Sequence, residues 1–199
     1  MSLEEREGGR RVKLQLSKGG HVMKSIGAFI FTIVVTAAMI SSCNEDTTND
    51  PGGSTPDASL FAHVTQTDPF TSYTLFPNAD SVTSGTLNGS TAHQPLIRVS
   101  MNDTAFSVLQ AGVLPPGTRF PNGSVVFKEI ITGGQTSLYA VMMKDTASEF
   151  AGNGWLWAEY YPDGRVAISV EGNGSACVAC HSLEQGLQND FVRTFERQN

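Results

Sequence analysis

Hydrophobic and polar residues alternate along most of the second half of the chain, and this two-residue period predicts β-strands. The pattern predicts five strands, at residues 95–101, 124–132, 137–144, 155–161 and 165–170. The alternation is weaker in the first of them than in the other four. Gly133-Gly134 and Pro162-Asp163-Gly164 supply turns between neighbouring runs. Because such short turns join successive strands, we expect antiparallel pairing.

Helical signals flank the predicted strands. Asn102 or Asp103 can cap a helix that runs to Gly112. Near the C-terminus, three apolar residues are spaced to pack one helical face, namely Phe191, Val192 and Phe195. For residues 61–89 we expect irregular structure or short helical turns. The predicted fold class is therefore α+β, mainly an antiparallel β-sheet with flanking helices, and a four-helix bundle is excluded because its sequence would read as helical throughout.

An apolar run near the N-terminus predicts an export signal. Residues 26–39 are apolar and follow the short basic start Met23-Lys24-Ser25. The run is shorter than the roughly 20 residues that a membrane-spanning helix needs. Since residues 1–22 are polar, we expect translation to begin at Met23. Residues 1–42 are accordingly expected to be a gene-model extension followed by a lipoprotein signal peptide.

Ser41-Ser42-Cys43 resembles a bacterial lipobox, in which the signal is cut before a cysteine whose sulfur carries lipid. Ordinary secretory cleavage and an uncleaved anchor are the alternatives. Residues 43–59 are acidic and rich in Gly, Pro, Ser and Thr, so we expect a lipidated flexible linker. Residues 60–199 then form one domain. The expected location is the bacterial cell envelope, lipid-anchored, facing the periplasm or on the outer membrane or cell surface.

The charge balance of the chain is acidic. The whole sequence has 13 basic and 19 acidic residues, and residues 43–199 keep 7 and 16 of them, a net charge of −9. This excludes nucleic acid as a partner, because phosphate binding needs a basic face. It suits a well-solvated exported domain and is compatible with a cationic redox partner protein.

Cys177-Val178-Ala179-Cys180-His181 is the most specific motif of the chain. A Cys-x-x-Cys-His run is the attachment sequence for haem c, in which the thiols add to the vinyl groups and the histidine binds the iron. A redox-active disulfide or a structural zinc site would be the alternatives. Neither fits, because no βαβ context surrounds the run and the remaining cysteine and histidines show no paired spacing. We expect covalent haem c held by Cys177 and Cys180, with His181 as the metal ligand, in a C-terminal attachment segment.

A C-terminal haem motif behind antiparallel strands resembles the cytochrome P-460 family and its relative cytochrome c′-beta. The segments that carry the resemblance are residues 93–99, 120–130, 139–145, 154–160, 177–181 and 190–195. The resemblance implies an iron with an open distal site, which oxidises hydroxylamine and also handles nitric oxide. It also implies a lysine cross-linked to the haem. Lys128 in Val125-Val126-Phe127-Lys128-Glu129 matches that lysine, although Phe127 stands where the pattern has a valine.

The residues around Lys128 give independent support of limited strength. On a strand, Lys128 points to the same side as Val126 and Ile130, which are apolar. A lysine among apolar neighbours must reach solvent, pair or react. The opposite side is also mostly apolar, so a lysine at the edge of the sheet is the alternative.

Two further roles follow from the resemblance. Active relatives use a distal carboxylate, and Glu171 is the first candidate, followed by Glu129 and Glu159. The iron could instead be capped by a sixth ligand, with candidates Met101, Met142, Met143, His63 and His93.

The expected function is oxidation or binding of small nitrogen species, hydroxylamine and nitric oxide, with Lys128 and Glu171 as catalytic residues. The alternative is a protein without turnover, either a gas-binding protein like cytochrome c′-beta or an electron-transfer cytochrome. Family members are often homodimers, so a second copy is a candidate partner.

Overall fold

The computed structural model describes residues 55–76 and 81–198. The expectations for the signal peptide, for lipidation of Cys43 and for the linker up to residue 54 fall outside these residues. Within the described part of the chain, no helix combines the length and the apolar character that a membrane crossing requires.

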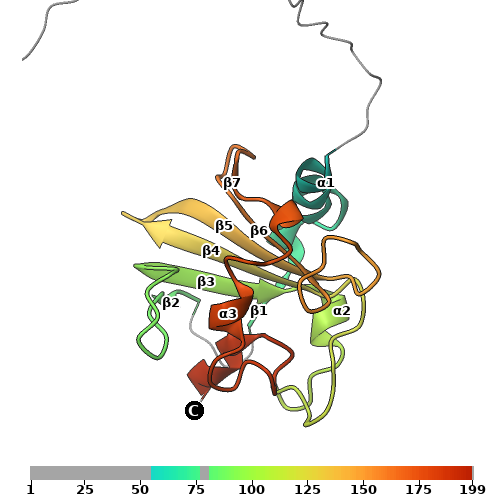
Figure 1. The fold of residues 1–199 in the computed structure, drawn as a ribbon. Helices are drawn as coiled ribbons and strands as arrows, with labels where there is room; N and C mark the ends of the chain where they lie inside the picture. Colours follow the sequence, from blue (N-terminus) through green and yellow to red (C-terminus); the bar gives the residue numbers. More distant parts are fainter. Residues whose placement is uncertain (1–54, 77–80, 199) are drawn as a thin grey trace, which may run out of the picture. The chain divides into compact units, whose positions relative to one another are not determined.

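An antiparallel sheet of seven strands forms the centre of the fold (Figure 1). Its long strands lie side by side in chain order: β3 (Leu96–Met101), β4 (Val125–Thr132), β5 (Gln135–Lys144) and β6 (Trp155–Tyr160). Three short strands complete the edges: β1 (Thr74–Leu75) and β2 (Thr83–Ser84) both pair with β3, and β7 (Val166–Ile168) pairs with β6. The predicted α+β class with a mainly antiparallel sheet is confirmed.

The register of the long strands places polar residues in one row across the sheet. Lys128 of β4 lies opposite Ala140 of β5, and Ala140 lies opposite Glu159 of β6. Residues that face one another in a sheet project to the same side. Lys128 and Glu159 therefore share a face, and only the small side chain of Ala140 stands between them.

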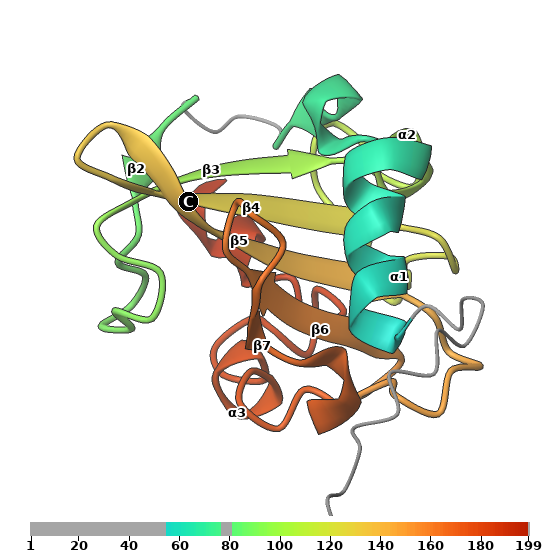
Figure 2. The same ribbon diagram turned by 90° about the horizontal axis from the view of Figure 1, so that it is seen from above.

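Each face of the sheet carries its own hydrophobic core. On one face, α1 (Pro56–Ala62) and the π-helical turn η1 (His63–Thr67) contribute Leu60 and Val64 to a cluster with Phe127 and Tyr160. The other face, which includes Met101, Val126 and Trp157, packs against residues 174–198, which are called the C-terminal segment below. Figures 1 and 2 show α1 and the C-terminal segment on opposite sides of the sheet.

The helices are shorter than predicted. The helix after Asn102 is the single turn α2 (Asp103–Phe106), and the left-handed backbone at Ala111 and Gly112 is incompatible with the predicted helix as far as Gly112. The C-terminal region holds one turn, α3 (Val178–His181), and the 3₁₀ helix η4 (Arg193–Gln198). Two further 3₁₀ turns are η2 (Phe70–Ser72) and η3 (Val170–Gly172).

Helix α1 begins at Pro56, within the segment that the sequence analysis assigned to the linker. The side chain of Thr55 caps α1, and Pro56 occupies the first turn, where a proline is tolerated. The carboxylate of Asp57 accepts hydrogen bonds from Ser169 Oγ (2.6 Å) and Val170 N (2.8 Å). Part of the segment predicted as linker therefore anchors a helix to the sheet.

Candidate functional site

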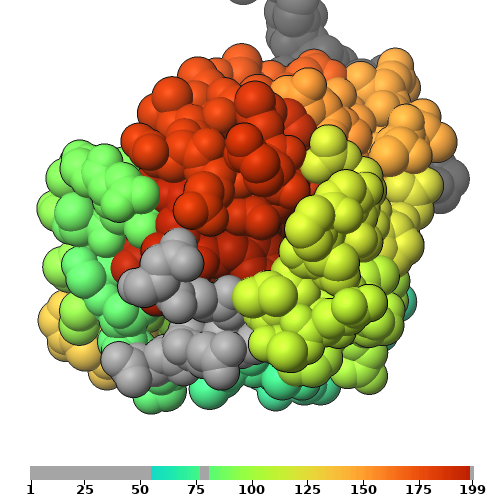
Figure 3. Space-filling view, turned by 90° about the horizontal axis from the view of Figure 1, so that it is seen from below, coloured from blue at the N-terminus to red at the C-terminus, as the bar shows by residue number. Residues whose placement is uncertain are grey.

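A cavity of about 200 Å³ lies between the sheet and the C-terminal segment. Apolar side chains of β4, β5 and β6 form one wall, and residues 176–181 and 192–197 form the opposite wall. Residues between 85 and 93 close a third side. Figure 3 shows the C-terminal segment, in red, in the middle of the face seen from below, flanked by the green residues that follow β2.

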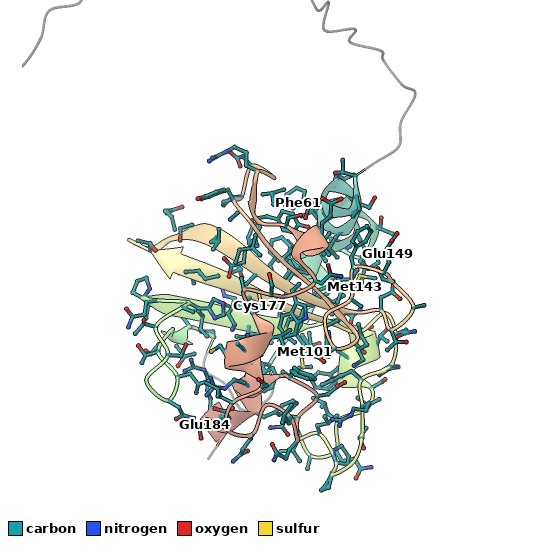
Figure 4. The ribbon with its side chains drawn as sticks, in the orientation of Figure 1. Phe61, Met101, Met143, Glu149, Cys177 and Glu184 are labelled. Atoms are coloured by element: carbon teal, nitrogen blue, oxygen red, sulfur yellow. The ribbon has the colours of Figure 1, made fainter. Side chains whose placement is uncertain are left out.

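The three chemically distinctive residues of the predicted haem motif all line this cavity. Cys177 and Cys180 are free thiols, and Figure 4 shows Cys177 at α3, where that turn faces the strands. The ring of His181 contacts the Phe191 carbonyl through Nδ1 at 2.8 Å. When Nδ1 is the protonated nitrogen and donates this bond, Nε2 keeps its lone pair for a metal.

Burial keeps the side chains of His181 and Cys177 uncharged. Burial, followed by the charge of Lys128, lowers the pKa of His181 to about 3. Burial, with the carboxylate of Glu159 as a further cause, raises the pKa of Cys177 to about 11. At neutral pH the chain therefore presents a neutral imidazole, as iron coordination requires, beside a protonated thiol.

Gly174 allows the motif to lie this close to the sheet. Its φ is +70°, and a Cβ there would lie 2.4 Å from Cδ1 of Trp157. Trp157 is fixed by donating from Nε1 to the Gly152 carbonyl (2.8 Å), and its ring centroid lies 4.8 Å from that of His181. A glycine at position 174 thus permits the tryptophan to support the histidine.

His93, which the sequence analysis named only as a candidate iron ligand, connects the two polar residues of the sheet row. His93 Nδ1 lies 3.1 Å from Lys128 Nζ, and His93 Nε2 lies 3.4 Å from Glu159 Oε1. A neutral imidazole protonated on Nε2 suits both neighbours, because Nδ1 then accepts from the lysine and Nε2–H faces the carboxylate. Lysine, histidine and glutamate form a connected polar group on the cavity wall.

The charges of this group are coupled. Burial, and next the positive charge of Arg197, lower the pKa of Lys128 to about 8. The charge of Lys128, and next burial, lower the pKa of His93 below its ordinary value. The Lys128 amine is thus uncharged far more often than that of an ordinary lysine.

Two arginines after the motif also reach the cavity. Arg193 is buried and pairs with Glu196 at 2.9 Å, and it donates to the Cys180 carbonyl at 3.3 Å. Arg197 donates to the Thr86 carbonyl at 3.1 Å. The sequence contained a signal for them, since two of the seven basic residues in 43–199 follow the motif closely.

The carboxylate in the cavity is not the one that the sequence analysis placed first. Glu171, the first candidate, lies in η3 with an exposed side chain and does not line the cavity. Glu129 lies outside the cavity lining and pairs with Arg98 at 3.0 Å. The cavity carboxylate is Glu159, the last of the three candidates. Choosing Glu159 requires the β5–β6 register, which residue spacing alone does not provide.

The five candidates for a sixth iron ligand divide in the same way. Met142 and His93 line the cavity. Figure 4 shows Met101 on the side of Cys177 and Met143 on the side of α1, in agreement with their separate hydrophobic clusters. Neither of these two methionines, nor His63 in η1, is among the lining residues.

The residues of the cavity fit a haem. Two free thiols and a histidine with a metal-binding nitrogen lie on one wall, as thioether attachment and axial ligation require. The facing wall has apolar side chains such as Val126 beside Lys128 and Glu159, and its apolar part suits the porphyrin ring. Arg193 and Arg197 supply positive charge for carboxylate substituents.

Comparison with known proteins agrees with this assignment. The family model Cytochrome P460 matches residues 79–194. Among curated proteins no match was found. The matched segment covers more than half of the chain and includes β2 to β7, the cavity row and Cys177 to His181. The chain therefore belongs to the cytochrome P460 family, which implies that it is a haem protein.

Proposed function

We propose that this chain is an exported haem c protein that oxidises or binds small nitrogen species, hydroxylamine and nitric oxide, at an open iron site. The observation that carries the proposal is the Lys128 amine in the cavity that also holds the Cys-x-x-Cys-His motif. Its pKa of about 8 makes this lysine a usable nucleophile near neutral pH.

The motif residues hold the cofactor in this proposal. Each thiol, Cys177 and Cys180, adds as S–H across one vinyl group, a step that needs no electron donor or acceptor. His181 binds the iron through Nε2, while the Phe191 carbonyl fixes the ring. When bound, haem supplies a redox-active iron with a position for a small ligand.

Lys128 is proposed to form the cross-link of the P-460 type. Its uncharged Nζ would hold the porphyrin covalently at a meso carbon, one C–N bond replacing an N–H and a C–H bond. Two electrons and two protons leave, and an oxidant of the peroxide class must accept the electrons. His93 Nδ1, 3.1 Å from Nζ, is placed to take a proton from the amine.

Glu159, in place of Glu171, is proposed as the carboxylate that handles protons. Oxidation of hydroxylamine releases protons, so turnover needs an acceptor beside the bound substrate. Glu159 lines the cavity, and His93 Nε2, 3.4 Å from Glu159 Oε1, connects the carboxylate to Lys128. Lys128, His93 and Glu159 would then form one connected polar path along the cavity wall.

The alternative function is electron transfer or gas binding without turnover. The observation that favours electron transfer is the presence of Met142 and His93 in the cavity lining, since either side chain is of a type that caps haem iron. Saturated six-coordination of the ferrous iron, with no binding of nitric oxide, would establish the electron-transfer form.

Location and partners are proposed from the sequence. Lipidation at Cys43 would tether the domain to the bacterial cell envelope, and the membrane would be one partner. A redox partner protein would exchange electrons with the iron, and a second copy of the chain is a further candidate.

A spectrum and a mass measurement on purified holoprotein test the cross-link. We expect a red-shifted Soret band and a haem-bearing peptide that contains Lys128 in addition to the peptide with Cys177 and Cys180. Lys128→Ala should restore an ordinary haem c spectrum, and the peptide that contains position 128 should no longer be attached to haem. If wild type and Lys128→Ala have the same haem c spectrum and the same peptides, the cross-link is refuted.

Intact mass of membrane-extracted protein reports whether Cys43 carries lipid.

The two glutamates provide a matched test of turnover. Glu159→Gln should lower hydroxylamine oxidation by about 10²-fold or more, because general acid–base catalysis contributes 10² to 10⁴. Glu171→Gln changes an exposed carboxylate outside the cavity and should leave the rate unchanged. Equal rates for both variants would remove Glu159 from the mechanism, and turnover lacking in wild type itself would favour the binding function.

A further inference from the structure

The carbonyl that contacts His181 belongs to a strained turn. Asp190 and Phe191 have φ angles of 51° and 70°, in the left-handed region that non-glycine residues, and bulky ones above all, rarely adopt. Phe191 is the residue whose carbonyl oxygen lies 2.8 Å from His181 Nδ1. The direction of this hydrogen bond therefore depends on whatever keeps the turn in its strained conformation.

A buried ion pair holds the turn from the far side. Lys144 Nζ donates to both carboxylate oxygens of Asp190, at 2.9 and 3.1 Å, and both side chains are nearly inaccessible to solvent. The same carboxylate accepts from Phe120 N at 3.0 Å, and Trp155 Nε1 donates to the Asp190 carbonyl at 2.9 Å. Lys144 also lies over the Trp155 ring, 4.9 Å from its centroid.

These groups lie outside the cavity and cannot touch a bound cofactor directly. Lys144, Asp190, Trp155 and Phe120 are all absent from the cavity lining. Such a pair adds little net stability to the fold, because removing two charges from water costs free energy. A pair that is bonded at every oxygen and attached to a strained turn fits a role in fixing geometry.

We propose that the Lys144–Asp190 pair is a positioning device for the iron ligand, acting through the Phe191 carbonyl on His181. The inference rests on the proposed role of His181 as the proximal ligand. A carbonyl held against Nδ1–H fixes the plane of the imidazole and increases its electron donation to a metal. Greater donation stabilises ferric over ferrous iron, so the pair keeps the reduction potential low.

The test uses holoprotein variants that retain the cavity residues. In Lys144→Met the apolar part of the side chain remains while its charge is lost, and in Asp190→Asn an acceptor for Phe120 N remains. We expect the ferric-to-ferrous equilibrium to shift towards ferrous iron by about tenfold, which is about 59 mV for one electron. The iron–histidine stretching frequency of the ferrous protein should fall. Arg165→Met, which breaks the exposed pair with Asp163, is the control and should leave both values unchanged.

Folded variants with the wild-type potential and the wild-type iron–histidine frequency would overturn the proposal. Should Lys144→Met fail to take up haem, Asp190→Asn and Trp155→Phe, each removing part of the network, decide the question by the same two measurements. A failure of the premise that His181 binds the iron looks different, because wild type itself would then lack an iron–histidine stretch.

Discussion

Lys128 illustrates how position alone changes the chemistry of a side chain. Neither its strand nor its neighbours Phe127 and Glu129 differ from an ordinary sheet segment. What distinguishes it is burial facing the C-terminal segment, with Arg197 nearby and His93 at 3.1 Å. Each of these factors comes from a distant part of the chain, so the apolar alternation around Lys128 could not separate a cavity lysine from a lysine at the edge of the sheet.

The pKa of Lys128 leads to a pH prediction for the haem-free protein. With a pKa of about 8 instead of 10.5, the amine is charged below pH 8 and increasingly uncharged above it. At pH 7 it offers about 300-fold more free amine than an ordinary lysine. Competitive acetylation, followed by mass spectrometry of the Lys128 peptide, should give a rate that rises through a midpoint near pH 8.

Two controls accompany this measurement. Unfolded protein in denaturant should show the ordinary lysine midpoint near 10.5. Arg197→Met removes a positive charge that lowers the pKa, so its midpoint should move upward. A wild-type midpoint that coincides with that of the unfolded chain would mean that the lysine is solvated.

At the scale of elements, strands were predicted well and helices poorly. The strand prediction succeeded because alternation and glycine turns are local signals, and β4 and β6 begin within one residue of their predicted starts. The helix after Asn102 ends at Phe106, and the backbone is left-handed at Ala111 and Gly112, which the cap signal at Asn102 does not specify. Helix α1 was missed because its cap and proline lie in a segment whose composition resembles a linker.

The site was predictable only where its residues are adjacent in sequence. Cys177, Cys180 and His181 are joined in one motif and lie together on the cavity wall. Glu159 and His93 reach the cavity through strand register and through a loop before β3, and no spacing rule connects them. For the same reason Glu171, close to the motif in sequence, was ranked above the carboxylate that lines the cavity.

Helix α1 gives a stability prediction at this scale. Leu60 is 4% exposed and packs with Val64 in the cluster on the α1 face of the sheet. Leu60→Ala should lower the free energy of unfolding by about 2–4 kcal/mol, because a buried leucine leaves a cavity when truncated. Chemical denaturation of holoprotein measures the change.

The matched control is Leu75 in edge strand β1, which is 43% exposed. Leu75→Ala should change the unfolding free energy by no more than about 0.5 kcal/mol. If both leucine variants are equally stable, α1 does not support the sheet in solution.

At the scale of the whole molecule, the two faces of the sheet are covered in different ways. One is covered by α1 and η1, and the other by a C-terminal segment made of single turns. Short turns have few internal hydrogen bonds, so this segment depends on its contacts with the sheet and with whatever fills the cavity. Cofactor binding and C-terminal order should therefore be coupled.

Hydrogen exchange of haem-free and haem-loaded protein measures this coupling. We expect residues 174–195 to exchange at least about tenfold more slowly with haem bound, since ligand binding suppresses local opening. The amides of β4 and β5, which pair along their whole length, should change much less. Uniform slowing across the chain, or none in the C-terminal segment, would contradict the prediction.

The length of the hairpin turn at Gly133-Gly134 determines which residues of β4 and β5 lie opposite one another. It joins β4 to β5, and the number of residues between them decides that Lys128 meets Ala140, with the shift between Ile130 and Ile131 included in the count. Side chains in a strand change sides at every residue. Deleting one glycine from the turn would therefore place opposite Lys128 a residue of β5 whose side chain lies on the α1 face in the wild type. The arrangement of side chains in the cavity is therefore encoded in the length of a turn as much as in the residues that line it.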